Sequence, residues 1–566
     1  MYLSGDGVQA SQARGIEWIE RAARHGLVDA QLEMARIYAD GHGVAADRAR
    51  EVEWLELAAA QGSALAQNNL GNVLLYGRGV PANPQEGVRW LRASADQGFA
   101  PAEYTLGAAY KRGLGVDPDL SQAAHWYAKA AAQGDAAAQN DYGALLEAGD
   151  GVARDPVAAV VWYEKAAEQG NEIAMENLGR CHLLGVGVAE DPAAALQWLR
   201  RAGAAGSVRA MEMLGRMYVE GRGVPTDLTE AAFWLRRAAE LGSLDSQFSL
   251  GQMQLQGRGL EQSDEKAVLW FRKAAEAGHA PSQGQLGWLY EAGTGVTRDD
   301  SEAMRWYRLG AEGGDSRSQA FLGRNLMTGK GAPKDIEEGS RWIRRAAEQG
   351  LPAAQVTLAY MYQQGIGVAP DPNEALRLYR AAAEQGLAEA QFELGNRYYL
   401  GTGVPQSYEQ ALVWLRKASD QDLARARTLL GTMYRLGQGV PQDPAEAVRQ
   451  WQLAAERGDA GAQNNLAMSL MEGHGIARDP KAAVGWFEKS ARQGVANSQF
   501  SLASSYAQGI GVDRDYVRAY AWLELCVAQK FPNAEQARRA VGQVLTPEQL
   551  ASARALAQEL ASAIPH

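Results

Sequence analysis

Apolar and small residues recur along the chain with a period of 36 residues. In motifs such as AQNNLG, the residue after the leucine falls at fourteen positions, each 36 residues beyond the last, from Ala35 to Ala503. A small residue stands five positions before each of these anchors, a leucine usually stands one position before, and often a tyrosine stands three positions after. Because these spacings place the side chains on one face of a helix, the pattern predicts an amphipathic helix in each repeat, called helix A below.

A turn and a second helix, helix B, follow helix A in the pattern. Helix A ends at Gly-x-Gly, as in Gly41–Gly43, and glycine readily adopts the positive φ that closes a helix. Four residues later stands Asp, Asn or Ser, the residue types that cap a helix N-terminus. Helix B carries Trp seven residues beyond this cap in thirteen units and usually ends in glycine. An aromatic series can stack on bases or sugars, but its fixed position beside small residues favours packing between helices.

The repeated helix–turn–helix predicts an all-α fold, an α-solenoid of about fifteen 36-residue repeats in which stacking supplies the core. Residues 1–29 form a truncated first repeat, with Tyr2, Gly5, Gly7 and Trp18 in the same register. Residues 30–530 form fourteen repeats, and residues 531–566 form C-terminal capping helices. In this last segment Thr546 and Gln549 have the spacing of a capping box at the start of an amphipathic helix.

Composition excludes several classes of protein. The 566 residues carry a formal net charge of −11, whereas nucleic-acid binders usually have a basic surface. No apolar stretch approaches the roughly 18 residues of a membrane span, and the N-terminus lacks the pattern of a signal peptide. Two cysteines, Cys181 and Cys526, are too few for a disulfide framework or a Cys-rich metal site. We therefore expect no nucleic-acid partner and no direct membrane insertion.

The sequence contains no constellation typical of catalysis. The seven histidines are scattered, and neither HExxH nor CxxC spacing occurs. Cys181 and His182 are adjacent, so on a helix their side chains point about 100° apart. The segment Gly323–Gly331 has neither the spacing of a phosphate-binding loop nor a Ser or Thr after Lys330. We expect no catalytic residue, no metal and no cofactor.

The unit seen in Ala66–Gly98 (AQNNLGNVLLYGRGVPANPQEGVRWLRASADQG) resembles the Sel-one-like repeat (SLR) family, a branch of the tetratricopeptide-repeat superfamily. The resemblance covers about 530 residues and implies a right-handed superhelix with helix A lining the concave side. It also implies an adaptor or scaffold for protein complexes, in bacteria often in envelope assembly, secretion, signalling or host contact.

The chain departs from the family pattern in two ways. Cysteine-rich members hold each unit with a disulfide, which this chain lacks. The chain opens halfway through a helix A, which we interpret as the absence of a native N-terminal segment. The expected compartment is therefore the cytoplasm, or the periplasm if a signal peptide has been removed.

Binding residues are expected where the repeats differ from one another. One position after the anchor, and one turn to either side, helix A should face the concave groove. Arg, Trp and Tyr dominate the binding energy of protein interfaces. The candidate partner-binding residues are Tyr104, Arg180, Arg216, Trp288, Arg324, Tyr360, Asn396 and Tyr399. The alternative is that Glu176–Arg180 and Glu212–Arg216 are ion pairs within one helix on a solvated surface.

Three hypotheses for function follow. The first is a non-enzymatic scaffold that binds a peptide or helix of a protein partner in the concave groove. The second, from the resemblance alone, is an envelope protein that binds or hydrolyses cell-wall fragments or β-lactams. The third is a structural protein that self-associates through its N-terminal edge, where half a helix A leaves apolar surface exposed.

Overall fold

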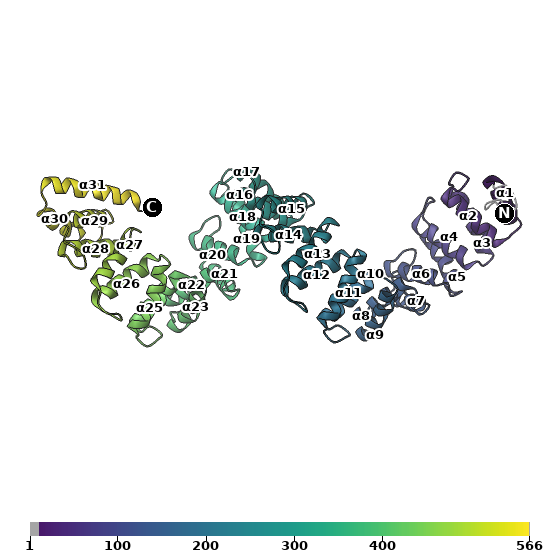
Figure 1. Ribbon diagram of the computed structural model, residues 1–566, viewed down its shortest axis with the longest axis horizontal. Coiled ribbons are helices and arrows are strands. Elements are labelled where there is room, and N and C mark those ends of the chain that lie inside the picture. The colour runs from purple at the N-terminus through teal and green to yellow at the C-terminus, as the bar shows by residue number, and fades with distance from the viewer. Residues whose placement is uncertain (1–10, 565–566) are drawn as a thin grey trace. The chain divides into compact units, whose positions relative to one another are not determined.

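The computed structural model describes residues 11–564, and in this part of the chain every regular element is a helix (Figure 1). The predicted all-α fold of helix–turn–helix repeats is confirmed. Tyr2, Gly5, Gly7 and His566 lie outside the described residues. The chain divides into two compact units, unit 1 (Met1–Ala277) and unit 2 (Gly278–His566), and each is considered by itself.

Helices A and B alternate along both units. The A helices are α2 (Val28–Asp40), α4 (Ala64–Tyr76), α6 (Ala100–Arg112), α8 (Ala136–Ala148), α10 (Glu172–Leu184), α12 (Val208–Glu220), α14 (Leu244–Gln256), α16 (Ala280–Ala292), α18 (Ser316–Thr328), α20 (Pro352–Gln364), α22 (Ala388–Leu400), α24 (Ala424–Leu436), α26 (Ala460–Glu472) and α28 (Ala496–Gln508). The B helices are α1 (Gln12–Arg24), α3 (Arg48–Ala60), α5 (Pro84–Ala95), α7 (Leu120–Ala132), α9 (Pro156–Glu168), α11 (Pro192–Ala205), α13 (Leu228–Glu240), α15 (Asp264–Glu276), α17 (Asp300–Glu312), α19 (Ile336–Glu348), α21 (Pro372–Glu384), α23 (Tyr408–Asp420), α25 (Pro444–Glu456), α27 (Pro480–Ala491) and α29 (Tyr516–Ala528). Two further helices, α30 (Ala534–Gly542) and α31 (Pro547–Ala563), follow the last repeat.

The Gly-x-Gly turns join helix A to helix B and also touch the preceding repeat. In each of these turns within residues 11–564 both glycines have positive φ, between 63° and 83°. In most of these turns the second glycine lies against the first turn of the preceding helix B, whereas a Cβ at Gly403 would meet only Nη1 of Arg397, at 3.9 Å. A Cβ added at Gly151 would lie 2.1 Å from the carbonyl carbon of Leu120. This close backbone contact requires glycine, and it fixes the spacing of consecutive repeats.

The predicted helix caps are confirmed. The Asp, Asn or Ser before every B helix accepts a hydrogen bond from a backbone N–H of the first turn, as Asp155 does from Ala158. Thr546 and Gln549 form the predicted capping box of α31. Asp422 and Lys530, which replace the glycine at the end of helix B, adopt the same left-handed conformation, with φ of 64° and 56°.

The core lies between each helix A and its helix B. The small residues and leucines of helix A are buried, as Ala174 and Leu178 show, and Gly179 lies against Leu199. The prediction that tryptophans pack between helices is confirmed for a buried set and wrong for Trp18, which is 56% exposed. The buried tryptophans are Trp54, Trp126, Trp234, Trp306, Trp342, Trp451 and Trp522.

A series of glutamines links consecutive repeats and was not predicted from the sequence. Gln139 donates through Nε2 to the carbonyl oxygen of Ala131 at 3.2 Å, and it accepts from Nε2 of Gln169 at 2.8 Å. The same pairing of glutamines 30 residues apart recurs in Gln61–Gln31, Gln97–Gln67, Gln349–Gln319, Gln385–Gln355, Gln421–Gln391, Gln493–Gln463 and Gln529–Gln499. The sequence signal is a Gln four positions before the anchor together with the Gln just after helix B, which is followed by Gly in most of these repeats and by Asp422 and Lys530 in two.

Candidate functional site

The eight predicted binding residues are divided between the two units. Tyr104, Arg180 and Arg216 belong to unit 1, and the other five belong to unit 2. All lie on A helices, so the repeat pattern placed them on the expected element.

Arg180 of α10 is engaged within the protein. Its Nη2 lies 2.5 Å from Oε2 of Glu147 on α8, and the hydroxyl of Tyr163 on α9 donates to the same oxygen at 3.0 Å. Burial would raise the pKa of the Glu147 carboxyl, but the hydrogen bond and charge of Arg180 hold that pKa below its ordinary value. The cluster therefore joins three consecutive helices and leaves little of the guanidinium for a partner.

Arg324 of α18 takes part in an equivalent cluster in unit 2. Its Nη2 lies 2.7 Å from Oε1 of Glu291 on α16, Lys330 Nζ lies 2.7 Å from the same oxygen, and Tyr307 of α17 donates to Oε2 at 2.6 Å. Burial acts to raise the pKa of Glu291, but the hydrogen bonds from Lys330 and Tyr307 and the charge of Arg324 lower it overall. Glu, Tyr and Arg occupy the same repeat positions in both clusters.

The alternative of ion pairs within one helix is wrong for both Arg180 and Arg216. Glu176 accepts from the hydroxyl of Ser207 at 2.8 Å, and Glu212 accepts from the hydroxyl of Ser243 at 2.5 Å. Both carboxylates thus bind the N-cap serine of the next helix A. The physical reason is that the serine hydroxyl of the next repeat is partly buried, so water competes little for its hydrogen bond to the glutamate. An ion pair between glutamate and arginine along one solvated helix face would be weakened by water.

Arg216 of α12 differs from the other two arginines. In the preceding repeat Leu183 occupies the position that Glu147 and Glu291 hold in the two clusters. Among the described residues no carboxylate pairs with the Arg216 guanidinium, and its side chain is exposed. Arg216 thus presents a positive charge on the helix-A side of unit 1.

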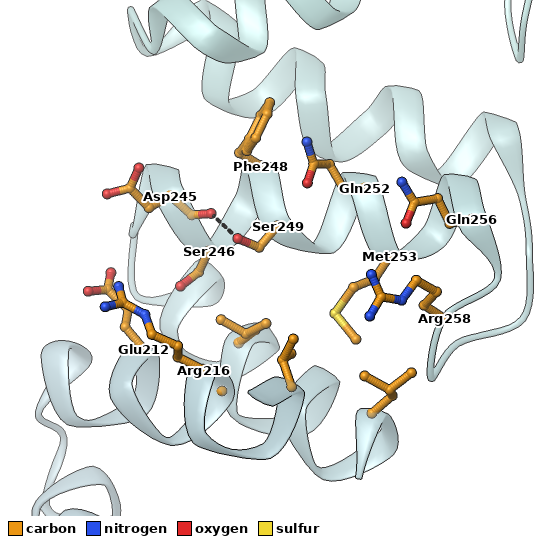
Figure 2. A pocket seen from close by; sticks show the side chains of 14 residues that line it. Glu212, Arg216, Asp245, Ser246, Phe248, Ser249, Gln252, Met253, Gln256 and Arg258 are labelled. Carbon is orange, nitrogen blue, oxygen red and sulfur yellow. Dashed lines mark hydrogen bonds between the residues drawn. The ribbon is translucent and has the colours of Figure 1, made fainter. Parts of the chain in front are cut away.

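A pocket of about 500 Å³ lies beside Arg216, between α12 and α14, with α13 at its base. In Figure 2 Arg216 lies toward the left of this pocket, and Arg258, from the turn after α14, lies toward the right. We call this the α12–α14 pocket. The lining residues are Glu212, Gly215, Arg216, Val219, Leu228, Leu235, Asp245, Ser246, Phe248, Ser249, Gln252, Met253, Gln256 and Arg258.

The α12–α14 pocket combines apolar walls with polar groups that are available for hydrogen bonding. Phe248, Met253 and the leucines of α13 supply the apolar part. The hydroxyl of Ser246 is buried and has no hydrogen-bond partner among residues 11–564. The repeat pattern indicated Arg216 but gave no signal for Ser246 or Arg258, because each of these two is ordinary for its position and only the neighbouring helix makes it part of a pocket.

The remaining predicted residues are varied in their surroundings. Tyr104 hydrogen-bonds to Asp141 at 3.4 Å, and burial, followed by the charge of Asp141, raises its pKa to about 12. Trp288 and Tyr360 are exposed apolar side chains, Asn396 is half-buried, and Tyr399 packs against Tyr408 with ring centroids 5.7 Å apart. Whether they bind a partner stays a prediction.

The described part of the chain shows no arrangement typical of metal or thiol chemistry. Between residues 11 and 564 no three His, Cys, Asp or Glu side chains are grouped so that they could hold a metal ion. Cys181 and Cys526 are buried free thiols, and burial raises their pKa to about 11 and about 12. Across the same residues no helix has the length and apolar character needed to cross a bilayer.

The repeats define a family. The model of the Sel1 repeat family matches fifteen segments, at residues 1–27, 28–63, 64–99, 100–135, 136–171, 173–207, 208–243, 244–279, 280–315, 316–351, 352–387, 388–423, 424–459, 460–495 and 496–526. The chain therefore belongs to the Sel1 repeat family, and the resemblance seen in the sequence is confirmed. This solenoid fold is typically used for protein–protein interaction and is generally a non-catalytic scaffold.

Solved structures with the same repeat include proteins from bacteria. The protein c5321, a protective antigen present in uropathogenic Escherichia coli strains, is 35% identical and has a TM-score of 0.62, with 78% of this chain and 94% of that chain covered. A Sel1 repeat protein from Oxalobacter formigenes is 33% identical, with a TM-score of 0.41, 58% of this chain and 93% of that chain covered. No curated protein matches the chain in sequence.

Proposed function

We propose that this chain is a non-enzymatic scaffold that binds a segment of a partner protein on its helix-A side. In unit 1 the binding site is the α12–α14 pocket. The observation that carries the proposal is a contrast among the arginines at one repeat position, of which Arg36 pairs with Glu33 of its own helix. Arg180 and Arg324 are neutralised by a glutamate of the preceding repeat, whereas Arg216 faces no such carboxylate.

The chemistry of the pocket indicates the kind of segment that it would hold. The guanidinium groups of Arg216 and Arg258 are both exposed and form no ion pair with the described residues, so each can bind a carboxylate of the partner. Between them, Phe248 and Met253 offer apolar contact, and the Ser246 hydroxyl offers one hydrogen bond. A peptide or helix with an acidic residue next to an apolar one satisfies these groups, because charged and apolar contacts then form together.

The test compares the full chain with two charge-reversal variants as bait for proteins of the source cell. Arg216→Glu alters the pocket, and the matched control, Arg380→Glu, alters an exposed arginine of α21 that forms no ion pair within the described residues. A photo-crosslinking residue at Gln252, which lines the pocket, identifies what lies there. A partner that crosslinks at position 252 and is lost only with Arg216→Glu is the expected result.

Two results would contradict the proposal. A partner recovered equally by all baits would move the binding site away from the α12–α14 pocket. The absence of any crosslinked protein, with the fold of each bait verified by circular dichroism, would exclude binding at this pocket altogether.

A further inference from the structure

A second pocket, of about 600 Å³, lies on the helix-B side of unit 1 and shares no lining residue with the α12–α14 pocket. We call it the α15 pocket, because α15 supplies four of its eight lining residues. The lining residues are Arg236, Gln254, Leu260, Glu261, Lys266, Leu269, Trp270 and Lys273.

Three cations surround the α15 pocket against a single carboxylate. Arg236 comes from α13, while Lys266 and Lys273 come from α15, and the carboxylate is Glu261. None of the three cations forms an ion pair with any residue in the described range, and all three are exposed. The local excess of positive charge contrasts with the net charge of −11 of the whole chain.

The centre of the α15 pocket is apolar. Leu269 is 64% exposed, and Trp270 beside it is half-buried. Lys273 lies over the Trp270 ring, 5.6 Å from its centroid, so the ammonium is held at the rim by a cation–π contact. One repeat earlier, Phe233 stands at the position of Leu269 and is 50% exposed. An apolar surface with a cationic rim is therefore present at this end of unit 1.

We infer that the α15 pocket is a second docking site, which binds an acidic segment of a partner protein with an apolar side chain between its carboxylates. The apolar side chain packs on Leu269 and Trp270, while the carboxylates pair with Arg236, Lys266 and Lys273. Charge complementarity carries this choice of occupant. An anionic membrane is disfavoured, because the negative charge of the whole chain repels such a surface and only the local pocket is positive.

The site is independent of the proposed function, since the two pockets have no lining residue in common, although α13 and α14 contribute to both. Occupation of both would allow one repeat pair to join two acidic segments. Linked sites of this kind raise the overall affinity for a partner that carries both segments.

The test is a selection of displayed random dodecapeptides on the full-length protein. Enriched peptides should carry several Asp or Glu residues around an aromatic or leucine residue. The Lys273→Glu variant should bind these peptides about tenfold more weakly than the natural chain, or weaker still. Binding should also weaken in the Leu269→Ser variant, and for the natural chain at high salt. The matched controls are Lys165→Glu and Val161→Ser, which change the same repeat positions in α9, where Lys165 lies over Trp162 at 4.2 Å. Neither control should affect binding.

Other outcomes separate the alternatives. Peptides that bind Lys273→Glu as well as the natural chain would overturn the inference. If binding is lost with Arg216→Glu instead, the selected peptides occupy the α12–α14 pocket, which supports the proposed function and overturns the second site. If the chain floats with phosphatidylserine vesicles and the Lys273→Glu variant does not, the α15 pocket binds an anionic lipid surface and not an acidic peptide. That result would also overturn the inference. No enrichment of acidic sequences at all would also overturn the inference.

Discussion

The guanidinium of Arg180 lies 2.5 Å from the carboxylate of Glu147, which belongs to the preceding repeat. The pair thus acts between repeats, and Tyr163 of the intervening helix donates to the same carboxylate. In a solenoid each repeat contacts only its neighbours, so such a cluster strengthens one particular interface of the array. The position of this cluster therefore determines which interface between repeats is stabilised. It also engages Arg180 within the protein, whereas Arg216 stays available for a partner.

Replacement of Arg180 by Met should destabilise the interface between α8 and α10. It leaves the Glu147 carboxylate partly buried with one partner fewer, at a cost of roughly 1–3 kcal/mol. Native-state hydrogen exchange of α8, α9 and α10 measures this cost locally. Arg216→Met is the control and should change protection by less than about 0.5 kcal/mol. Equal losses of hydrogen-exchange protection in Arg180→Met and Arg216→Met would contradict the conclusion that only Arg180 stabilises an interface between repeats.

Glu291 should make the stability of unit 2 depend on acidic pH. Its pKa is lowered in the fold below the ordinary value of 4.5, so the ionised carboxylate stabilises the folded state. That contribution is fully present above the ordinary value and is lost as the pH falls through the lower, folded value. Glu291→Gln should therefore be less stable than the natural chain at neutral pH, by roughly 1–3 kcal/mol, and the gap should close in acid.

Urea unfolding midpoints over a range of pH measure this gap for Glu291→Gln. Glu384→Gln, at an exposed glutamate that forms no ion pair with the described residues, is the control and should show no such gap. A difference that stays constant from neutral to acidic pH would show that the ionisation of Glu291 is not responsible.

The glutamine series should tolerate methionine better than alanine. At the position of Gln139 the next two repeats carry Met175 and Met211, both buried. Gln139→Ala removes two hydrogen bonds and leaves a cavity, at an expected cost of roughly 2–3 kcal/mol, whereas Gln139→Met fills the space and should cost about half as much. Hydrogen exchange in α7, α8 and α9 distinguishes the two. A greater loss for methionine than for alanine would mean that the hydrogen bonds, and not the filled volume, dominate at this position.

Two glycines with the same backbone conformation should differ in their response to alanine. Gly151 and Gly170 both have positive φ, at 69° and 91°. A Cβ at Gly170 meets no atom within 4 Å, so Gly170→Ala carries only the conformational cost of about 1–2 kcal/mol. Gly151→Ala also collides with the backbone of Leu120 and should cost roughly 1–3 kcal/mol more. Thermal unfolding of the two variants checks the order, and similar midpoints would show that the turn can move away from the preceding helix.

Much of the fold could be predicted, because each structural role recurs at the same position in every repeat. The Gly-x-Gly turn, the cap at Asp155 and the buried leucines each follow from local chemistry that a periodic sequence repeats. The C-terminal capping box followed from the spacing of Thr546 and Gln549 alone. The predicted packing of the tryptophans between helices is wrong at Trp18, where the periodicity gave the helix position but not the amount of covering surface.

The candidate site depends on contacts that the sequence does not contain. Arg180 and Arg216 look alike along the chain, each with a glutamate four residues earlier. Only the packing of neighbouring A helices brings Glu147 to Arg180 and the N-cap serine of the next helix A to Glu212. The same packing forms the α12–α14 pocket from residues that belong to two repeats.

The amino-acid sequence by itself determined the repeat, its helices, turns and caps, and hence the family, because these depend on interactions within about 36 residues. The tertiary structure decided which charged side chains neutralise one another and which stay exposed. The physical reason is that an ion pair forms where a carboxylate lies within a few ångströms of its partner and is shielded from water, and between Glu147 and Arg180 that closeness exists only after the repeats have stacked.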